Sequence, residues 1–480
     1  MEGRPDGAAF RVPAGTLAPV VRIGAWVLLA VVLAVLLAVK LPLLDLPFYW
    51  DEAWVYGPAV RTLAREGPSL LPGALPPELG RGHPLLFHAT LGMVGLLFGD
   101  TPVVLHAAAL GLSLVLLITL FLVVRAEAGP GAAVLAVTAL AFQPVFLAQS
   151  GLVLPEVMLS LFTVLAVAAC RSGRHGPLAV ALTGAVLTKE SGLAVAAAVV
   201  LYMGYEAWKR GRWPSRSALM AWVAPFAAFS VHALLQWEAH GWFLYPEHVG
   251  HTVTDPAAVL ANLTEGYGAF LLVYQGRNAL VILALLGVVA LRWRGLSIPH
   301  GTTQGLLWTV IAALLCFSAL NFYSARYILA AVVLLCWSLG LVLAPFLQGN
   351  LRTLAAMAVV ALVTFVANGP RSTADSDLGY AEGARAIRDL AQHLSRPDDP
   401  GGTVAAPYIV REALTEPLAG YVERPLPADR LAVEAADADR IVRMDFASYG
   451  EELTVLRDAL LEARFDHGPA HVALYRTTAR

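Results

Sequence analysis

The stretch Trp50-Asp51-Glu52 directly follows the first long apolar run of the chain, residues 22–46. Two carboxylates therefore stand where a membrane helix should emerge into water. Acidic side chains next to hydrocarbon are energetically costly and usually serve a function. A polar loop and a series of further apolar runs come after this stretch. The pattern predicts an all-α polytopic membrane protein with an active site on its outer face.

The composition supports this fold class. Hydrophobic residues make up 58% of the chain and charged residues 14%, whereas a soluble domain averages about 25% charged residues. The net charge of −2 gives no indication of nucleic-acid binding. The run at 22–46 is longer than a signal-peptide core and lacks an A-x-A-like site after it, so it is predicted to be a retained anchor.

A transmembrane helix needs roughly 20 apolar residues. The chain contains apolar runs of suitable length near 22–46, 102–124, 130–148, 156–171, 217–236, 267–291, 304–322, 327–346 and 352–368. The shorter segment 83–99 is predicted to lie flat in the outer interface, within a first outer loop at 47–101. Residues 177–205 are interrupted by Thr188-Lys189-Glu190-Ser191 and flanked on both sides by basic residues, which predicts a hairpin of two helices with its tip outside.

These segments give about eleven transmembrane helices, with a cytoplasmic N-terminus and the C-terminal part outside. Residues 1–369 are predicted to form the membrane module and residues 370–480 a small extracytoplasmic α/β domain. In that domain we expect strands near 402–406 and 471–475 and helices at 380–394 and 449–463. The location is predicted to be the inner membrane of a bacterium.

The predicted order and orientation of the membrane spans place a set of polar side chains near the outward-facing surface of the membrane. The set consists of Asp51, Glu52, Arg81, His83, Glu156, Lys189, Glu190, Asn321, Tyr323, Arg326 and Tyr327. This mixture suits a reaction that has an anionic leaving group and a nucleophile needing a base. Adjacent helical residues do not face the same way, so of the two neighbouring acids we expect Asp51, rather than Glu52, to be the base.

Structural interpretations of the same residues stay open. The acids at 51, 52 and 156 could begin helices, because negative charge is favoured at a helix N-terminus. Lys189 and Arg326 could extend to lipid headgroups.

Five short motifs, in order, resemble the GT-C glycosyltransferases, in particular the group containing protein O-mannosyltransferases and the lipid A aminoarabinose transferase. The motifs are Trp50-Asp51-Glu52-Ala53, Gly82-His83-Pro84-Leu85 with Leu97-Phe98-Gly99, Ser150 to Glu156, Leu187-Thr188-Lys189, and Ala325-Arg326-Tyr327. The sequence departs from the family pattern at Leu85, Glu156 and Glu190. There the family has a second proline, an aspartate and a glycine.

The resemblance implies an inverting transfer of a sugar from a polyprenyl-phosphate donor to a hydroxyl acceptor on a lipid, glycan or protein. It implies catalytic roles for the acidic motifs, with Asp51 as base, Glu52 beside it and Glu156 assisting. Lys189, Arg326 and Tyr327 would bind the donor phosphate.

Arg81 and His83 would belong to an acceptor or loop site. Some family members use a divalent metal ion, for which Asp51, Glu156 and His83 are the candidate ligands.

Three other classes of protein compete with this interpretation. A secondary transporter would show repeated halves and ionisable groups near the membrane midplane, but here the charges cluster at one face and no repeat is apparent. A polymerase or ligase of lipid-linked glycans would use similar lipids. A non-catalytic membrane scaffold would use its C-terminal domain to bind a partner.

Overall fold

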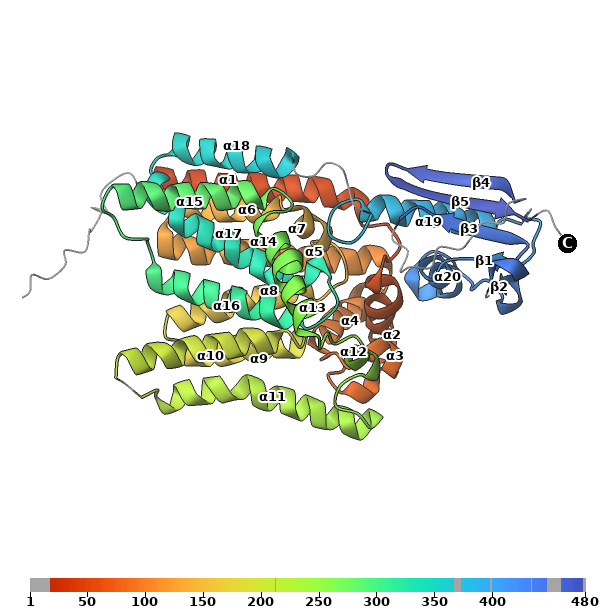
Figure 1. Ribbon diagram of the computed structural model, residues 1–480, viewed down its shortest axis with the longest axis horizontal. Helices are drawn as coiled ribbons and strands as arrows, with labels where there is room; N and C mark the ends of the chain where they lie inside the picture. The colour runs from red at the N-terminus through yellow and green to blue at the C-terminus, as the bar shows by residue number, and fades with distance from the viewer. Residues whose placement is uncertain are drawn as a thin grey trace, which may run out of the picture.

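The computed structural model describes residues 18–211, 213–366, 373–397, 399–432, 434–446 and 459–477. The molecule is elongated, with a bundle of helices at one end and a small sheet domain at the other (Figure 1). The helices of the bundle run along the long axis, and the sheet domain continues beyond one of its ends. We call this the outer end of the bundle.

Each apolar run predicted to cross the membrane contains helix. The helices are α1 (Ala18–Lys40), α5 (Pro102–Ala128), α6 (Pro130–Ala141) with α7 (Pro144–Gln149), α8 (Glu156–Arg171), α11 (Arg216–His240), α15 (Arg277–Trp293), α16 (Gly301–Ala319), α17 (Leu329–Leu343) and α18 (Asn350–Val366). Within the described ranges, five helices have the length and apolar composition to cross a membrane, or six if a bent pair counts as one span. The count of about eleven spans stays a prediction.

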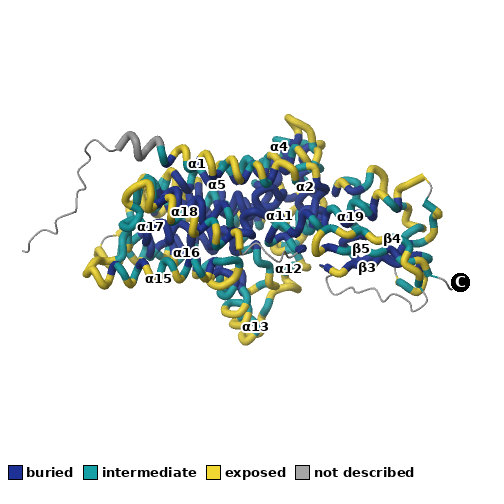
Figure 2. The backbone as a smooth tube through the Cα atoms, turned by 90° about the horizontal axis from the view of Figure 1, so that it is seen from above, coloured by how far each residue is buried: buried dark blue, intermediate teal, exposed yellow. Residues whose placement is uncertain are grey.

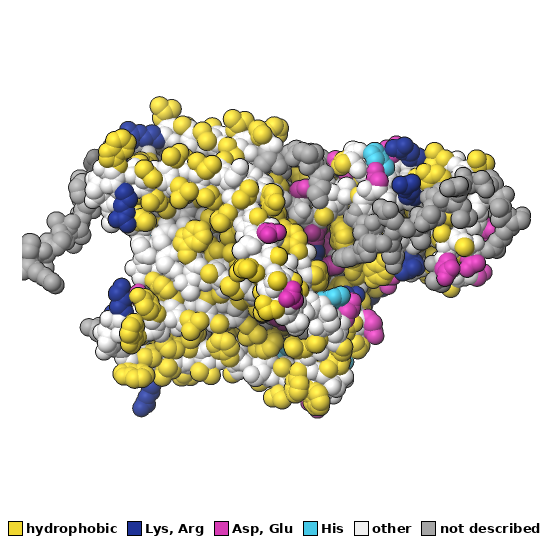
Figure 3. Space-filling view, viewed as in Figure 1, with side chains coloured by type: hydrophobic (Ala, Val, Ile, Leu, Met, Phe, Trp, Pro, Cys, Tyr) yellow, Lys and Arg dark blue, Asp and Glu magenta, His cyan; other side chains and the backbone are white. Residues whose placement is uncertain are grey.

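Helix α17 forms the centre of the bundle. All of its residues are buried, and it packs against α6, α8, α15 and α16. A helix that is apolar on every side is stable only when other helices or lipid surround it. Gly340 allows a close approach here, because a Cβ atom would lie 2.8 Å from the carbonyl oxygen of Ala132. Figure 2 shows the resulting buried interior, and Figure 3 shows hydrophobic side chains over the outside of the bundle.

The first outer loop folds into short helices at the outer end. They are η2 (Glu52–Tyr56), α2 (Gly57–Glu66), η3 (Pro72–Ala74), α3 (Pro77–Gly80) and α4 (Leu86–Phe98). Helix α4 corresponds to the segment predicted to lie in the interface, and it packs against α2. Its 13 residues would span only about 20 Å at 1.5 Å per residue, less than the hydrocarbon thickness.

The hairpin predicted for residues 177–205 is present as α9 (His175–Thr188) and α10 (Gly192–Lys209), which pack against each other. Residues 189–191 form the turn between them. Gly192 permits this tight turn, because a Cβ atom there would lie 2.3 Å from the carbonyl carbon of Ala185.

The prediction of a single helix over residues 267–291 was wrong, because this segment is broken into two helices. The chain breaks between α14 (Ala269–Leu272) and α15, and the axes on either side differ by 76°. Gln275 and Gly276 adopt positive φ angles of 55° and 77°, which end a right-handed helix. The buried Arg277 then donates hydrogen bonds to the carbonyl group of Phe270 and to Gln143.

Short helices precede this break in the loop that connects α11 to α15. They are α12 (Pro246–Gly250), α13 (Pro256–Ala261) and η4 (Asn262–Gly268). Helix α12 lies at the outer end of the bundle (Figure 1), whereas α13 projects from its side (Figure 2).

The C-terminal part combines α19 (Tyr380–Leu394) and α20 (Tyr408–Thr415) with a five-stranded sheet. The strands are β1 (Val404–Ala405), β2 (Leu431–Ala432), β3 (Arg440–Met444), β4 (Leu460–His467) and β5 (Ala470–Arg476), in the order β2-β1-β3-β5-β4. Strands β1, β2 and β3 pair in parallel, and β3-β5 and β5-β4 pair antiparallel. The prediction of a helix at 449–463 was wrong for residues 460–463, which form the beginning of β4. The earlier residues 449–458 lie outside the described ranges.

The C-terminal domain shares a hydrophobic core with the first outer loop. One continuous cluster contains Tyr49, Trp54 and Phe87 of the loop together with Tyr380 and Ala384 of α19. Polar contacts reinforce the junction, since Lys40 Nζ donates to Tyr380 Oη at 2.8 Å. The domain is therefore held against the outer end of the bundle. The predicted boundary at 369/370 lies within residues 367–372, outside the described ranges.

Candidate functional site

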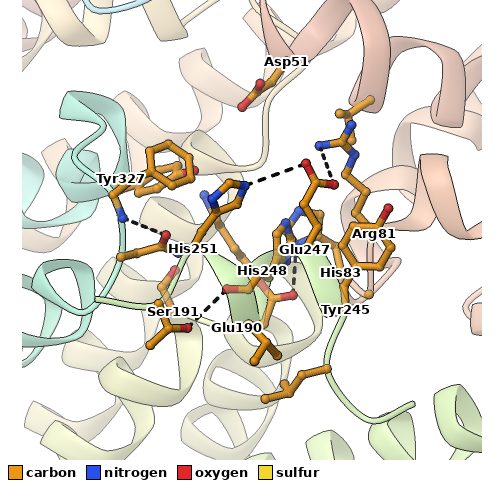
Figure 4. Close-up of a pocket in the computed structure, with 18 of the residues that line it drawn as sticks. Asp51, Arg81, His83, Glu190, Ser191, Tyr245, Glu247, His248, His251 and Tyr327 are labelled. Atoms are coloured by element: carbon orange, nitrogen blue, oxygen red, sulfur yellow. Dashed lines mark hydrogen bonds and ion pairs between the residues drawn. The ribbon is translucent and has the colours of Figure 1, made fainter. Parts of the chain in front are cut away.

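A cavity of about 690 Å³ opens at the outer end of the bundle (Figure 4). Six parts of the chain line it: the first outer loop, the tip of the α9–α10 hairpin, α11 through Phe229 and His232, residues 243–252, the region from Phe317 to Tyr327, and Tyr408 of α20. Its volume falls in the range that encloses small ligands. The acidic motif and the hairpin tip, which are far apart in the sequence, thus face one space.

A strained turn presents Asp51 to this cavity. Trp50 has a φ angle of 55°, which is uncommon for a bulky residue and often marks a functional site. The backbone N–H of Ala53 closes the turn on the carbonyl group of Trp50 at 2.6 Å. Asp51 lines the cavity with its side chain 20% exposed.

Arg326 connects three carboxylates behind the cavity wall. Its Nη2 pairs with Asp51 and its Nη1 with Asp375, and its Nε lies 3.4 Å from Glu156 Oε1. Lys189 Nζ contacts the same Glu156 oxygen at 2.7 Å. These five side chains, which we call the charge cluster, hold three acids and two cations.

Tyr327 packs against both cations of the charge cluster. Lys189 Nζ lies 4.2 Å and the Arg326 guanidinium carbon 5.3 Å from the centre of its ring. Cations are attracted to the face of an aromatic ring. Tyr327 and Lys189 line the cavity directly, whereas Arg326 is 4% exposed and lies behind them.

The acids of the cluster have different electrostatic environments. Burial tends to raise the pKa of Asp51, but the charge and hydrogen bond of Arg326, together with the charges of Arg81 and Lys189, outweigh burial, so the pKa is lower than usual. For Asp375, burial dominates over Arg326, and the nearby charges of Asp51 and Glu156 raise the pKa further. Asp51 is therefore held as a carboxylate in the ion pair, while Asp375 is the acid that its surroundings stabilise least in the charged form.

Glu52 has a different environment from its neighbour Asp51. It is fully buried, and its carboxylate accepts hydrogen bonds from the backbone N–H of Tyr49 at 3.1 Å and from that of Val153 at 2.5 Å. His106 Nε2 lies 2.9 Å from the same carboxylate. Glu52 thus joins the first outer loop to α5 and to the loop before α8, and it is absent from the cavity lining.

His83 and Glu190 form a second polar group in the cavity wall. His83 Nδ1 lies 2.9 Å from Glu190 Oε1, and His83 Nε2 lies 3.3 Å from Tyr56 Oη. Burial tends to raise the pKa of Glu190, but His83 outweighs it and the pKa falls to about 2. Glu190 therefore pairs with His83, and the ion-pair partner of the adjacent Lys189 is Glu156.

Arg81 belongs to the same side of the cavity. It adopts a φ angle of 42° and Gly82 one of 73°, so two successive left-handed residues turn the chain before His83. Arg81 Nη1 lies 3.7 Å from Glu247 Oε2, and His251 Nε2 lies 3.8 Å from Glu247 Oε1 (Figure 4). The loop that contains α12 thereby closes over this side of the cavity.

The remaining expected residues are divided between lining and packing positions. Asn321 lines the cavity. Tyr323 instead packs against Tyr267, with ring centres 5.0 Å apart, and is absent from the lining.

The candidate metal ligands Asp51, Glu156 and His83 do not come together. The first two flank Arg326, while His83 pairs with Glu190. Across the described ranges, no group of three or more His, Cys, Asp or Glu side chains is arranged to hold a metal ion. A divalent ion stays a prediction from the resemblance.

The sequence interpretation missed several residues of the site. Asp375 follows the last helix of the bundle in a polar segment that was assigned to the C-terminal domain. Glu247 and Tyr408 line the cavity from a long loop and from the C-terminal domain. Nothing in the local sequence distinguishes these residues from surface polar residues. The pairing of Trp54 with Tyr408, ring centres 5.3 Å apart, likewise depends on tertiary packing.

No protein-family model and no curated protein sequence matches the chain. The structure is similar to the crystal structure of ArnT from Cupriavidus metallidurans in the apo state, with a TM-score of 0.58. It is similar to the same protein bound to undecaprenyl phosphate, with a TM-score of 0.56. In both comparisons the identity is 15%, and the similarity covers 94% of this chain and 98% of ArnT.

The Archaeoglobus fulgidus oligosaccharyltransferase in complex with Zn and sulfate gives a TM-score of 0.48 at 13% identity, over 81% of this chain and 61% of that chain.

The similarity to ArnT shows that the chain has the GT-C membrane fold. The predicted fold class, a polytopic all-α membrane module with a small C-terminal α/β region, is thereby confirmed. The chain is a multi-pass membrane protein.

Proposed function

We propose that this chain is an inverting glycosyltransferase that moves a sugar from a polyprenyl-phosphate donor to a hydroxyl acceptor. One observation carries the proposal: a half-buried carboxylate, Asp51, and a cation, Lys189, line one cavity, and a second cation, Arg326, lies behind them and pairs with Asp51. The fold in which they meet is that of ArnT, whose crystal structure contains undecaprenyl phosphate. Such a lipid carries the kind of anionic group that these two cations could bind.

Asp51 is assigned as the general base. It accepts the proton of the acceptor hydroxyl while the hydroxyl oxygen attacks the anomeric carbon of the sugar. The bond between that carbon and the phosphate oxygen breaks, and the electron pair leaves with the lipid phosphate. Attack from the side opposite the leaving group inverts the configuration. Arg326 lowers the pKa of Asp51. The Asp51 carboxylate therefore becomes a stronger base once the donor phosphate has taken its place on the Arg326 guanidinium.

Lys189 and Arg326 are assigned to the leaving phosphate, with Tyr327 packed against both. Fixed cations in a site with little water stabilise charge that develops in the transition state. Glu156 contacts both cations and is 2% exposed, so it holds them in position. Arg81 and His83, on the other side of the cavity, are assigned to the acceptor.

Glu52 is assigned a supporting role. Its carboxylate is occupied by the hydrogen bonds that fix the turn carrying Asp51, and it does not reach the cavity. The two neighbouring acids would thus act differently, one on the substrate and the other on the backbone. A divalent metal would have to compete with Arg326 for Asp51. A metal requirement is tested by measuring transfer with and without a chelator.

The cavity is assigned to the extracytoplasmic face of a bacterial inner membrane. Basic side chains support this orientation, since they occur at the helix ends away from the cavity and mark the cytoplasmic side. These residues include Arg125, Arg171, Lys209, Arg210 and Arg294. Figure 3 shows Lys and Arg side chains at that end of the bundle.

The test compares Asp51→Asn with Asp45→Asn in purified protein supplied with polyprenyl-phosphate sugars. Asp45 is an acid just before the same loop, and its side chain is 68% exposed. Removing a general base should lower the rate by about 10²- to 10⁴-fold, and the control should keep wild-type transfer. Unchanged transfer by Asp51→Asn would exclude Asp51 as the base.

The products distinguish the competing functions. A glycosyltransferase releases one polyprenyl phosphate for each sugar transferred, and a polymerase or ligase of lipid-linked glycans would lengthen or move a glycan chain. Sugar or ion flux in proteoliposomes without consumption of the lipid donor would instead indicate a transporter.

A further inference from the structure

Asp375 is held in the charge cluster by contacts from three separate parts of the bundle. Gln149 Nε2 donates to the carbonyl oxygen of Asp375 at 2.7 Å, and Gln275 Nε2 donates to that of Ser376 at 2.8 Å. Tyr49 Oη donates to the carbonyl oxygen of Thr373 at 2.7 Å. Residues 373–379, which precede α19 and which we call the linker, are therefore fixed against the bundle, and Asp375 is held next to Arg326.

The two carboxylates on the Arg326 fork differ in their access to the cavity. Asp51 pairs with Nη2 and lines the cavity, whereas Asp375 pairs with Nη1 and is absent from the lining. A phosphate that enters from the cavity reaches the Asp51 side of the guanidinium first. Arg recognises carboxylates and phosphates through the same planar set of N–H groups, so the phosphate and Asp51 compete for one place.

The charge count of the cluster favours the release of one acid from Arg326 once the donor phosphate is bound. With its three acids and two cations, the cluster already holds one more negative charge than positive charge, and the donor phosphate adds another. Buried charges are stable only when they are paired. Because Asp375 and Glu156 also pair with Arg326, the charge that Arg326 presents to Asp51 is shared among three acids.

We propose that Asp375 is a positioning residue that anchors Arg326 from behind and shares its charge, so that Asp51 can leave the guanidinium when the donor phosphate takes its place. This inference rests on the proposed function. The linker of the C-terminal domain would then contribute to the reaction through Arg326, and Asp375 would not contact the substrate. Asp51, once released, is free to accept the proton of the acceptor.

The isosteric variant Asp375→Asn removes the shared charge and keeps the shape of the side chain. Arg326 then presents more of its charge to the cavity side, so two effects are expected. Undecaprenyl phosphate should bind about tenfold more tightly, a typical effect of one charge in a partly buried pair. The kcat for sugar transfer should fall by a similar factor, because the product phosphate is held more strongly and leaves the site more slowly.

Two further variants separate this role from a structural one. Asp375→Glu keeps the charge and should restore the affinity and kcat towards wild-type values. Asp377→Asn changes another acid of the linker, which accepts a hydrogen bond from the N–H of Gly379, and should leave both constants unchanged. Should Asp375→Asn fail to fold, Gln149→Met removes the bond that holds the backbone of Asp375 and should shift both constants in the same direction.

Binding is measured by calorimetry on the full chain in detergent, with undecaprenyl phosphate as the probe, and kcat with saturating donor. Tighter binding with slower transfer supports the inference. Weaker or unchanged binding by Asp375→Asn, with unchanged binding by the Asp377→Asn control, would overturn it. A wild-type protein that binds no undecaprenyl phosphate at all would instead count against the proposed function.

Discussion

Replacing Glu52 by glutamine should destabilise the protein without removing its chemistry. Glu52 Oε1 faces the backbone N–H of Val153 and His106 Nε2, and Oε2 accepts from the backbone N–H of Tyr49. A glutamine keeps one oxygen, which can stay at the Oε1 position. Its NH₂ group then faces the N–H of Tyr49, and two donors meet without an acceptor.

The size of the effect follows from these bonds. A buried donor left without a partner costs about 1–3 kcal/mol. The two remaining bonds lose the carboxylate charge, and charged bonds are roughly twice as strong as neutral ones, which adds about 1 kcal/mol. We therefore expect a loss of about 2–4 kcal/mol of stability. The sign is robust because Glu52 is 0% exposed and water cannot replace the lost acceptor.

The assay is the thermal unfolding rate in detergent, since unfolding of such a protein is governed by kinetics. Glu52→Gln should unfold faster than the wild type, and Glu78→Gln, an exposed acid of the same loop, should unfold at the wild-type rate. Per folded molecule, Glu52→Gln should retain far more sugar transfer than Asp51→Asn. A Glu52→Gln protein of wild-type stability that transfers no sugar would refute the reasoning and make Glu52 a catalytic candidate again.

Three further outcomes are expected. Lys189→Met should lower sugar transfer by about 10²- to 10³-fold, the usual effect of losing one contact to developing charge, measured as kcat with saturating donor. The pKa of Glu190 is depressed from 4.5 to about 2. Its contribution to stability is therefore present above pH 4.5 and is lost as the pH falls towards 2. The difference in thermal stability between wild type and Glu190→Gln should shrink over that pH interval. Gly192→Ala should distort the hairpin tip and weaken donor binding, because its Cβ atom would lie 2.3 Å from the Ala185 carbonyl carbon, whereas Gly204→Ala on the same helix has open space and should behave as wild type.

The helical segments could be predicted because their signals are local. The length of an apolar run and the charges at its ends identified α5, α8 and α11, and the interruption at Thr188-Lys189-Glu190-Ser191 identified the α9–α10 hairpin. The break before α15 was missed, although Gln275-Gly276-Arg277 contains a glycine and a buried cation. In an apolar run such residues are compatible with a continuous helix, and only the contacts of Arg277 with Phe270 and Gln143 decide the matter.

Strand β4 shows tertiary structure overriding local propensity. Residues 460–463 read Leu-Leu-Glu-Ala, all good helix formers, yet they pair with β5 in the sheet. Strand formation depends on neighbours that lie elsewhere in the chain. The sequence predicted a small α/β domain correctly, but the assignment of this segment required its partner strand.

The same distinction applies to the site. The positions of Asp51, Lys189 and Arg326 near one surface could be inferred, because each follows or interrupts an apolar run. The contact of Asp375 with Arg326 could not, because hydrogen bonds from Gln149 and Gln275 position the linker and no periodicity encodes them. The ion pair of Lys189 could not be inferred either, since its partner is Glu156, which is distant in the sequence, and Glu190 pairs with His83.

The separation of Asp51 from Glu52 depends on the backbone at Trp50. Two neighbouring acids in a regular helix would point about 100° apart, and both could remain near the surface. The left-handed conformation of Trp50 and the π-helical turn that follows instead direct Asp51 to the cavity and Glu52 to the buried N–H groups of Tyr49 and Val153. The hydrogen bonds of Glu52 in turn hold the strained turn in place. The proposed base and the residue whose hydrogen bonds support its turn are thus adjacent in the sequence.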